Sequence, residues 1–167
     1  GLYVHTGHAP LWAESEHIGA VIGNDFHVDR LAAFPHVVPN SLCGTVARAL
    51  GLTGHNGAFC SGEHGALSGL VLAVAALRQG RAGALLSVAG QQGEEGMLTG
   101  TLAPSSRTAR GATAFLVERE CSLGDRSGIS PLARVAGMSM GTIRPQRGLE
   151  DCRRVLGDAF EEAGIAQ

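Results

Sequence analysis

The sequence predicts an α/β protein in which helices cover a mostly parallel sheet. Short apolar runs alternate with segments of helical periodicity along most of the 167 residues, the pattern of repeated strand–helix units. The run "GALLSVAG" (Gly83–Gly90) is apolar throughout, as in a central parallel strand. Glycine is abundant and aromatic residues make up only 4% of the chain, which suits close packing of small residues. The length fits a single domain over residues 1–167.

The elements of the first half follow from apolar runs and from the residues that punctuate them. In order, they are a buried strand at Ile18–Gly23, a short helical turn over residues 26–36, a helix from Asn40 to about Leu50, a strand over residues 56–61 and a helix at Glu63–Gln79. Pro35 is expected to end the helical turn, and Asn40 or Ser41 to cap the next helix, with Gly51 just past its end. The last of these helices is apolar on almost every side, which predicts burial on nearly all sides.

The second half reads as further strands and a final helix. In order, we expect the strand Gly83–Gly90, a polar loop at Gln91–Arg110, strands over residues 112–120 and 130–141, and a helix over residues 148–164. The final helix is amphipathic, and its apolar face carries Leu149, Cys152, Val155, Leu156 and Phe160.

Composition excludes several classes of function. The net charge of −2 argues against a nucleic-acid surface, which needs a basic stripe. No apolar segment reaches the roughly 18 residues of a membrane span, and the N-terminus lacks a signal-peptide pattern. The cysteines are scattered without metal-ligand spacing, and we expect mostly buried free thiols in a reducing cytosol. They are Cys43, Cys60, Cys121 and Cys152.

Several polar motifs favour no chemistry. His5 and His8 ("HTGH") are too close for a comfortable shared metal site on regular structure and are expected on the surface. Residues 90–96 ("GQQGEEG") could cradle an anion, but Glu94 and Glu95 would repel it. Residues 51–57 ("GLTGHNG") lack the strand–GxGxxG–helix order of a dinucleotide site. We therefore expect no bound metal and no cofactor.

The junction after residues 56–61 is different, because a strand delivers its last residue to the start of a buried helix. Unpaired N–H groups and the helix dipole would lower a thiol pKa there and stabilise an oxyanion. Counted back from Gly80, the helix starts at Glu63, whereas Cys60 is still on the strand, facing opposite to Phe59, and is expected to be buried. Any nucleophile should stand at the helix start, and that residue is a glutamate.

The segment "FPHVVPNSLCGTVARALGLTGHNG" (34–57), followed by "SGEHGAL" (61–67) and "LRQGRAGALLSVAG" (77–90), resembles the N-terminal half of β-ketoacyl synthases of the thiolase fold. "GATAFLVE" (111–118) and the final helix extend the resemblance over nearly the whole chain from about Ile18. The resemblance implies a thiolase-like half: a mixed, mostly parallel sheet, a buried central helix and covering helices. The domain would be abbreviated, with the second thiolase half largely absent.

The same resemblance places the family's catalytic cysteine on Glu63, and nothing in this sequence matches the histidines that the family's second half supplies. Condensation by this chain alone is therefore not expected. "SGEHGAL" resembles the chain-length-factor subunits of type II polyketide and polyene systems, in which the cysteine is replaced. These subunits pair with an active ketosynthase, where the strand before the nucleophile helix adds to its counterpart, and they help shape the acyl tunnel.

The resemblance thus implies a cytoplasmic, catalytically inactive partner of an active ketosynthase in polyketide, polyene or fatty-acid-like biosynthesis. The acyl chain would arrive on an acyl carrier protein, which Arg78, Arg81 and Arg107 could contact. Candidate tunnel or interface residues lie before the junction and within it; core packing explains the first four equally well. They are Val37, Val38, Leu42, Val46, Phe59, Glu63 and His64.

Other readings remain open. Glu63 could plug the former oxyanion pocket or simply stabilise the helix N-terminus, a contribution of up to about 1 kcal/mol. The chain could also be a thiolase-like scaffold without influence on product length, a malonyl decarboxylase, or an unusual ketosynthase with Cys60 as its nucleophile.

Overall fold

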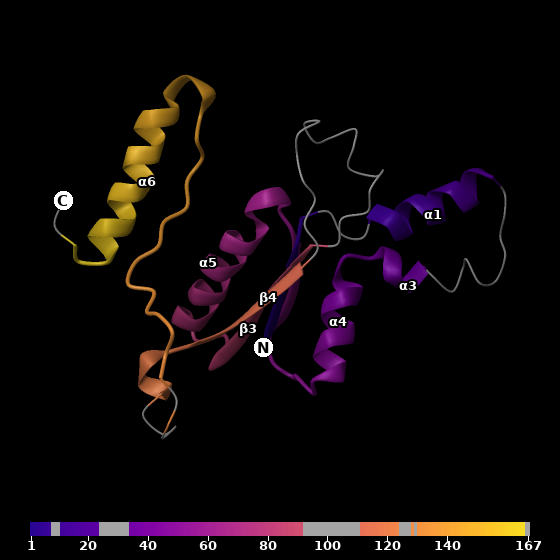
Figure 1. Ribbon diagram of the computed structural model, residues 1–167, viewed down its shortest axis with the longest axis horizontal. Helices are drawn as coiled ribbons and strands as arrows, with labels where there is room; N and C mark the ends of the chain where they lie inside the picture. Colours follow the sequence, from indigo (N-terminus) through magenta and orange to yellow (C-terminus); the bar gives the residue numbers. More distant parts are fainter. Residues whose placement is uncertain (8–10, 24–33, 92–110, 124–127, 129, 166–167) are drawn as a thin grey trace. The chain divides into compact units, whose positions relative to one another are not determined.

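The computed structural model describes residues 1–7, 11–23, 34–91, 111–123, 128 and 130–165 (Figure 1). The chain divides into two compact units, Gly1–Ser122 (unit 1) and Leu123–Gln167 (unit 2). Each is described by itself. The predicted loop Gln91–Arg110 falls almost entirely outside the described residues.

Unit 1 is built on a four-stranded mixed sheet in the order β2-β1-β3-β4. The strands are β1 (Leu2–Thr6), β2 (Asn56–Cys60), β3 (Ala84–Gln91) and β4 (Gly111–Glu118). Strand β1 pairs in parallel with β2 and β3, and β4 is antiparallel to β3. The predicted α/β class and mostly parallel sheet are confirmed. Strand β1, which lies in the middle of the sheet, was not predicted.

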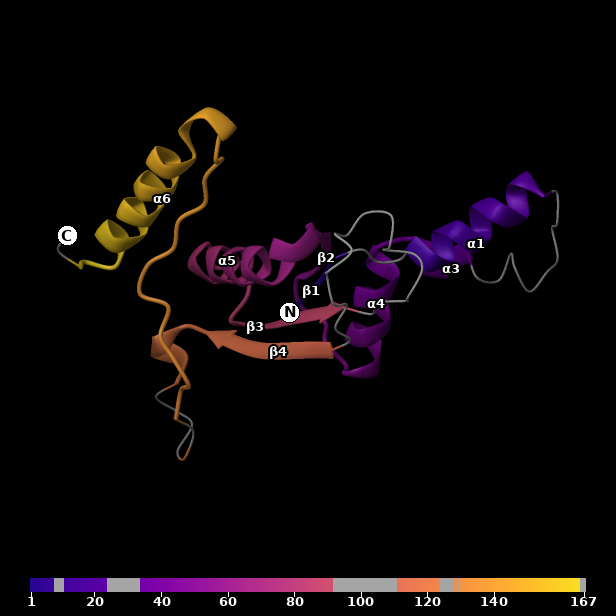
Figure 2. The ribbon, with the colours of Figure 1, turned by 45° about the horizontal axis from the view of Figure 1, so that its top comes forward.

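Helices cover the two faces of this sheet. Tyr3 of β1 packs with Ala73 and Leu77 of helix α5 (Gly65–Arg78). Its neighbours Leu2 and Val4 pack instead with helix α4 (Asn40–Ala49). Because successive side chains of a strand point to opposite faces, α5 and α4 cover opposite faces of the sheet. Figure 2 shows α5 along one of these faces.

The helix ends follow the sequence only in part. Gly51 and Gly80 follow α4 and α5 with φ of 65° and 70°, the left-handed backbone expected past a helix end. Side-chain capping of α4 by Asn40 or Ser41 is wrong. Pro39 is the N-cap, with φ −53° and ψ −32°, and no side chain caps the helix. Because Pro39 is already helical, neither polar residue takes the extended capping position.

Two predictions near the start of the chain are also wrong. Ile18–Gly23 is not a strand, because helix α1 spans Leu11–Ile22. A short apolar run does not distinguish a strand from a helix segment, and Ile18, Val21 and Ile22 have the i, i+3, i+4 spacing of one helix face. Pro35 does not end a helix either, since it lies in the first turn of helix α3 (Phe34–Val37), where its missing N–H costs nothing. The rest of that predicted turn lies outside the described residues.

Helix α5 is buried most deeply on the side that faces the sheet, and several of its other residues are partly buried within the described part of unit 1. Gly69, Ala73 and Leu77 face the sheet and are buried, whereas Leu67 is 70% exposed. Leu67 is therefore left largely uncovered by the described part of unit 1.

Unit 2 consists of an extended segment laid along helix α6 (Gly148–Glu162). The predicted helix is confirmed, but the predicted strand over residues 130–141 is wrong, because no described residue there belongs to a strand. The segment packs against α6 instead. A Cβ on Gly137 would lie 2.2 Å from the carbonyl oxygen of Ala159, so only glycine allows this approach.

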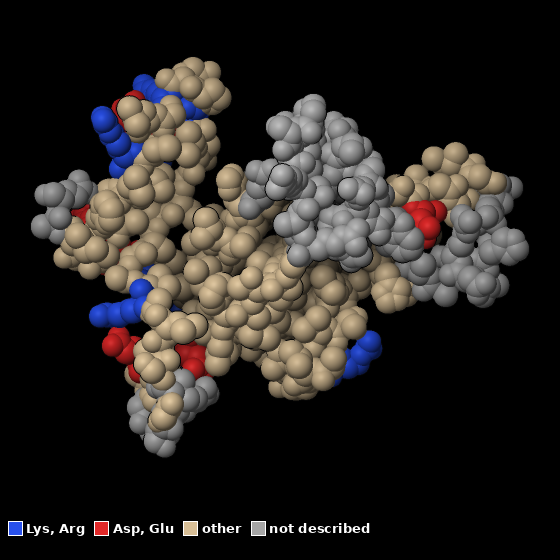
Figure 3. All heavy atoms as spheres, viewed as in Figure 1, with Lys and Arg blue, Asp and Glu red and all other residues tan. Residues whose placement is uncertain are grey.

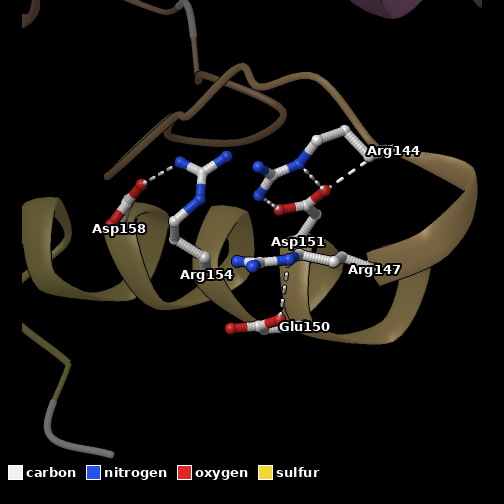
Figure 4. Close-up of polar contacts among 6 residues, drawn as sticks. All are labelled: Arg144, Arg147, Glu150, Asp151, Arg154 and Asp158. Atoms are coloured by element: carbon white, nitrogen blue, oxygen red, sulfur yellow. Dashed lines mark hydrogen bonds and ion pairs between the residues drawn. The ribbon is translucent and has the colours of Figure 1, made fainter.

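A carboxylate joins the two parts of unit 2 (Figure 4). Asp151 in the first turns of α6 is 2% exposed. It accepts hydrogen bonds from the Arg144 backbone N–H at 2.9 Å, Nε at 3.0 Å and Nη2 at 2.6 Å. These bonds hold the pKa of Asp151 well below its ordinary value. The charge pair therefore fixes the chain as it enters α6.

Surface charge, cysteine burial and membrane-spanning helices are the remaining features to compare with the sequence-based expectations. In Figure 3 the red and blue side chains stand apart from one another, and no continuous basic surface is seen on this face of the described residues. All four cysteines are free, but only Cys43 is buried, so the expectation of mostly buried thiols is wrong. In the described part of the chain, no helix is both long enough and apolar enough to cross a membrane.

Candidate functional site

The candidate site lies where the parallel strands end. Thr6 of β1 is in register with Cys60 of β2 on one side and with Gly90 of β3 on the other. The connection after β1 leads to β2, and the connection after β2 crosses β1 to reach β3, so the strand order reverses here. In open α/β sheets, ligands bind outside the carboxyl ends of strands at such a switch point.

The β2–α5 junction forms part of this edge. Strand β2 ends at Cys60, a 3₁₀ turn spans Gly62–His64, and α5 begins at Gly65. Gly62 has φ of 61°, a conformation in which a side chain is strained. Glu63 thus occupies the turn that leads directly into α5, at the positive end of the helix dipole. Its side chain lies outside what the structure describes.

Cys60 is the last residue of β2, and its environment differs from the expectation of burial. Its side chain is exposed, because β2 lies at the sheet edge and ends at this residue. The sulfur lies 3.5 Å from Thr6 Oγ1. Phe59, the preceding residue, packs toward α5, so Cys60 points to the opposite face of the sheet.

His5 is the residue that sequence reasoning misplaced. It is 1% exposed, so the expected surface position is wrong. Its ring stacks on Phe59 with centroids 4.8 Å apart and an interplanar angle of 7°. Neither ring nitrogen has a hydrogen-bond partner in the described structure, and burial lowers the pKa of His5. A short apolar run between Gly1 and Gly7 was the available signal for a strand here.

The candidate tunnel and interface residues divide into two groups. Val46 and Phe59 pack against the two core clusters on either side of the sheet. Val38 and Leu42 are 44% and 43% exposed at the start of α4, and Val37 is half-buried. His64 is exposed in the 3₁₀ turn. Core packing therefore accounts for the first pair, whereas Val38 and Leu42 remain accessible in unit 1.

The remaining candidate residues are the three arginines considered for carrier-protein contact, together with His8. Arg78 and Arg81 are exposed around the C-terminal end of α5, and Arg107 and His8 lie outside the described residues. No group of three or more His, Cys, Asp or Glu residues in the described part of the chain could hold a metal ion.

Solved structures share this architecture. The ishigamide ketosynthase/chain length factor matches 99% of this chain with a TM-score of 0.79 and 20% sequence identity, over 47% of its own length. The complex of the ketosynthase ApeO with its chain length factor ApeC from Xenorhabdus doucetiae matches 71% of this chain, with a TM-score of 0.61 and 17% identity, over 48% of the matched chain. No protein-family model matches the sequence, and no curated protein matches it.

These likenesses establish the fold. The chain has the thiolase-like α/β fold of ketosynthase and chain-length-factor proteins, as the sequence resemblance implied. It spans about half the length of the solved chains that it matches.

Proposed function

We propose that this chain is a chain-length-factor-type subunit that pairs with an active ketosynthase. The observation that carries the proposal is the β2–α5 junction, where a glutamate rather than a cysteine leads into the helix. A carboxylate at this position is stabilised by the helix N-terminus but cannot form the acyl thioester that condensation needs. The acyl chain would then be held by the partner, in a polyketide, polyene or fatty-acid-like assembly line supplied by an acyl carrier protein.

The position of β2 supports pairing with another subunit. Within the described sheet β2 has a single neighbour, β1, so its outer edge is available to another strand. Both solved structures named above are of a ketosynthase with a chain length factor. In our proposal, the ketosynthase partner adds its corresponding strand to the edge of β2.

The accessible residues before and within α4 support a role in shaping the tunnel. Val38 and Leu42 expose apolar surface near the start of α4, and contiguous apolar patches that are exposed in one subunit mark interfaces or ligand-binding grooves. We propose that both contribute to the wall that limits acyl-chain growth.

The test is product length in a reconstituted system. The chain is co-expressed with its ketosynthase, and Val38→Phe and Leu42→Phe are compared with the unaltered protein and with Leu50→Phe, another exposed apolar position at the end of α4. We expect shorter products from the first two variants and unchanged products from Leu50→Phe. If the complex persists and product length does not move, the chain is a scaffold rather than a chain length factor.

A further inference from the structure

His5 is an unusual residue for the interior of unit 1, because it is polar and buried. Its imidazole is buried between β2 and α5, with both nitrogens unpartnered in the described structure. A buried polar group without a hydrogen bond is destabilising, and an apolar side chain of the same shape would avoid that cost. Such a group therefore calls for an explanation beyond packing.

The packing around His5 is tight. A Cβ on Gly69 of α5 would lie 2.0 Å from His5 Nε2, so the ring occupies the space that any larger residue would need. On its other side the ring is stacked on Phe59 of β2. The imidazole is thus held between a helix and a strand, with no room to turn toward water.

No described charge faces the ring from the elements packed against it. On α5 it meets Gly65 and Gly69, on β2 it meets Phe59, and Ala89 of β3 is its register partner. The titratable neighbour is Tyr3 of the same strand, edge-on at 6.5 Å between ring centroids. The Tyr3 hydroxyl is hydrogen-bonded at 3.1 Å to His55 Nδ1, so its partner is His55 and not His5.

We propose that His5 is an acid-sensitive switch that holds the first turns of α5 against the sheet only while its imidazole is neutral. A proton taken from water creates an imidazolium that finds no anion and no hydrogen-bond acceptor among the described residues. The cation is accommodated when the first turns of α5 separate from β1 and β2 and admit water. Because the Gly62–His64 turn leads directly into α5, the same movement disorders the candidate site.

The direction of the effect follows from burial, which lowers the pKa of His5 from its ordinary value of 6.5. The unfolded or locally opened state therefore binds the proton more readily than the closed state. Stability that depends on neutral His5 is complete above pH 6.5 and is lost as the pH falls below it. One linked proton raises the opening equilibrium constant by up to about tenfold per pH unit.

Amide hydrogen exchange of the whole chain tests the switch without any partner, so its result is independent of the proposed function. Exchange of residues 65–73, corrected for intrinsic rates, is followed from about pH 7.5 to about pH 5, the range in which an ordinary histidine titrates. We expect opening of this segment to increase up to about tenfold per pH unit in the lower part of that range. Opening that does not change with pH overturns the proposal.

Variants assign the effect to His5. His5→Phe keeps a flat ring on Phe59 but cannot titrate. His5→Leu is a second variant that cannot titrate and has a smaller side chain. Both should abolish the acid-induced opening, whereas His36→Gln, at an exposed histidine of α3, should keep it. If either His5 variant retains the pH dependence of the original protein, another group is responsible. If neither variant folds, the pH profile of the unaltered chain decides, together with the C2–H exchange of His5, which should be slower than that of His36.

Discussion

Gly69 and His5 form a complementary pair at the residue scale. The glycine has no side chain where the imidazole needs room, and the imidazole fills what would otherwise be a cavity beneath α5. His5 cannot move aside, because Phe59 stacks on its other face. The packing of α5 on the sheet therefore depends on both residues together.

Replacing Gly69 with alanine should destabilise unit 1 by about 1–3 kcal/mol, the usual cost of overpacking a core. The new Cβ would lie 2.0 Å from His5 Nε2. Urea unfolding, followed by circular dichroism, measures the change. In a His5→Ala background the same Gly69→Ala substitution should cost little, because the colliding ring is gone.

Gly44→Ala is the matched control for this substitution. Gly44 is an exposed glycine within α4, and a Cβ there meets nothing within 4 Å. Alanine in a helix interior is favoured over glycine by about 0.5–1 kcal/mol, so this variant should gain stability. A Gly69→Ala protein as stable as Gly44→Ala would show that His5 does not pack as described.

At the element scale, the entry into α6 depends on a single carboxylate. The side-chain and backbone hydrogen bonds from Arg144 keep the pKa of Asp151 below its ordinary value of 3.8. A depressed pKa contributes stability above the unfolded-state value, and this contribution is lost as the pH falls below it. In Asp151→Asn, amide exchange over residues 144–151 should be faster at pH 6 but nearly insensitive to acid. In the original protein, it should accelerate from about pH 4 downward.

Asp158→Asn controls for a general effect of charge on α6. Asp158 pairs with Arg154 at 3.4 Å, with both side chains 52% exposed, and exposed pairs contribute little. In Asp158→Asn, amide exchange over residues 144–151 should accelerate at acid pH as it does in the original protein. Equal acid responses of the original protein and Asp151→Asn would contradict the role given to Asp151.

Strand β2 is the element expected to meet a partner. On binding an active ketosynthase, the amides of residues 56–60 should exchange more slowly, because new inter-strand hydrogen bonds protect them. Residues 111–118 of β4, at the opposite edge of the sheet, serve as the internal control and should change less. A stable complex in which β2 exchange is unchanged would place the interface elsewhere.

Sequence reasoning succeeded for elements with clear periodicity and ends. Helices α4, α5 and α6 and strands β2, β3 and β4 were all predicted close to their observed bounds, because glycine or long apolar patterns delimit them. It failed where a short apolar run fits either structure. Ile18–Gly23 belongs to a helix, and residues 130–141 pack along α6 without strand partners.

The candidate site was predictable in outline but not in its packing. The order Cys60 on a strand and Glu63 at the turn into a helix follows from counting back from Gly80. The burial of His5 does not follow from local sequence, because it depends on β1 lying between β2 and β3 and on Gly69 lying above it. Such contacts join residues far apart in the chain.

At the scale of the whole molecule, the fold and the glutamate at the β2–α5 junction both favour the proposed function. The chain has the thiolase-like fold of ketosynthase and chain-length-factor proteins over about half their length, with Glu63 at the turn into α5. Our proposal is therefore that it acts only together with a subunit that carries the acyl group.

Intact-mass spectrometry of the reconstituted pair tests this claim most directly. The chain and its ketosynthase are incubated with acyl-carrier-protein thioester, and the mass of each subunit is recorded. We predict an acyl adduct on the ketosynthase and none on this chain. An adduct on this chain that disappears in Cys60→Ala would contradict the account and make Cys60 the nucleophile.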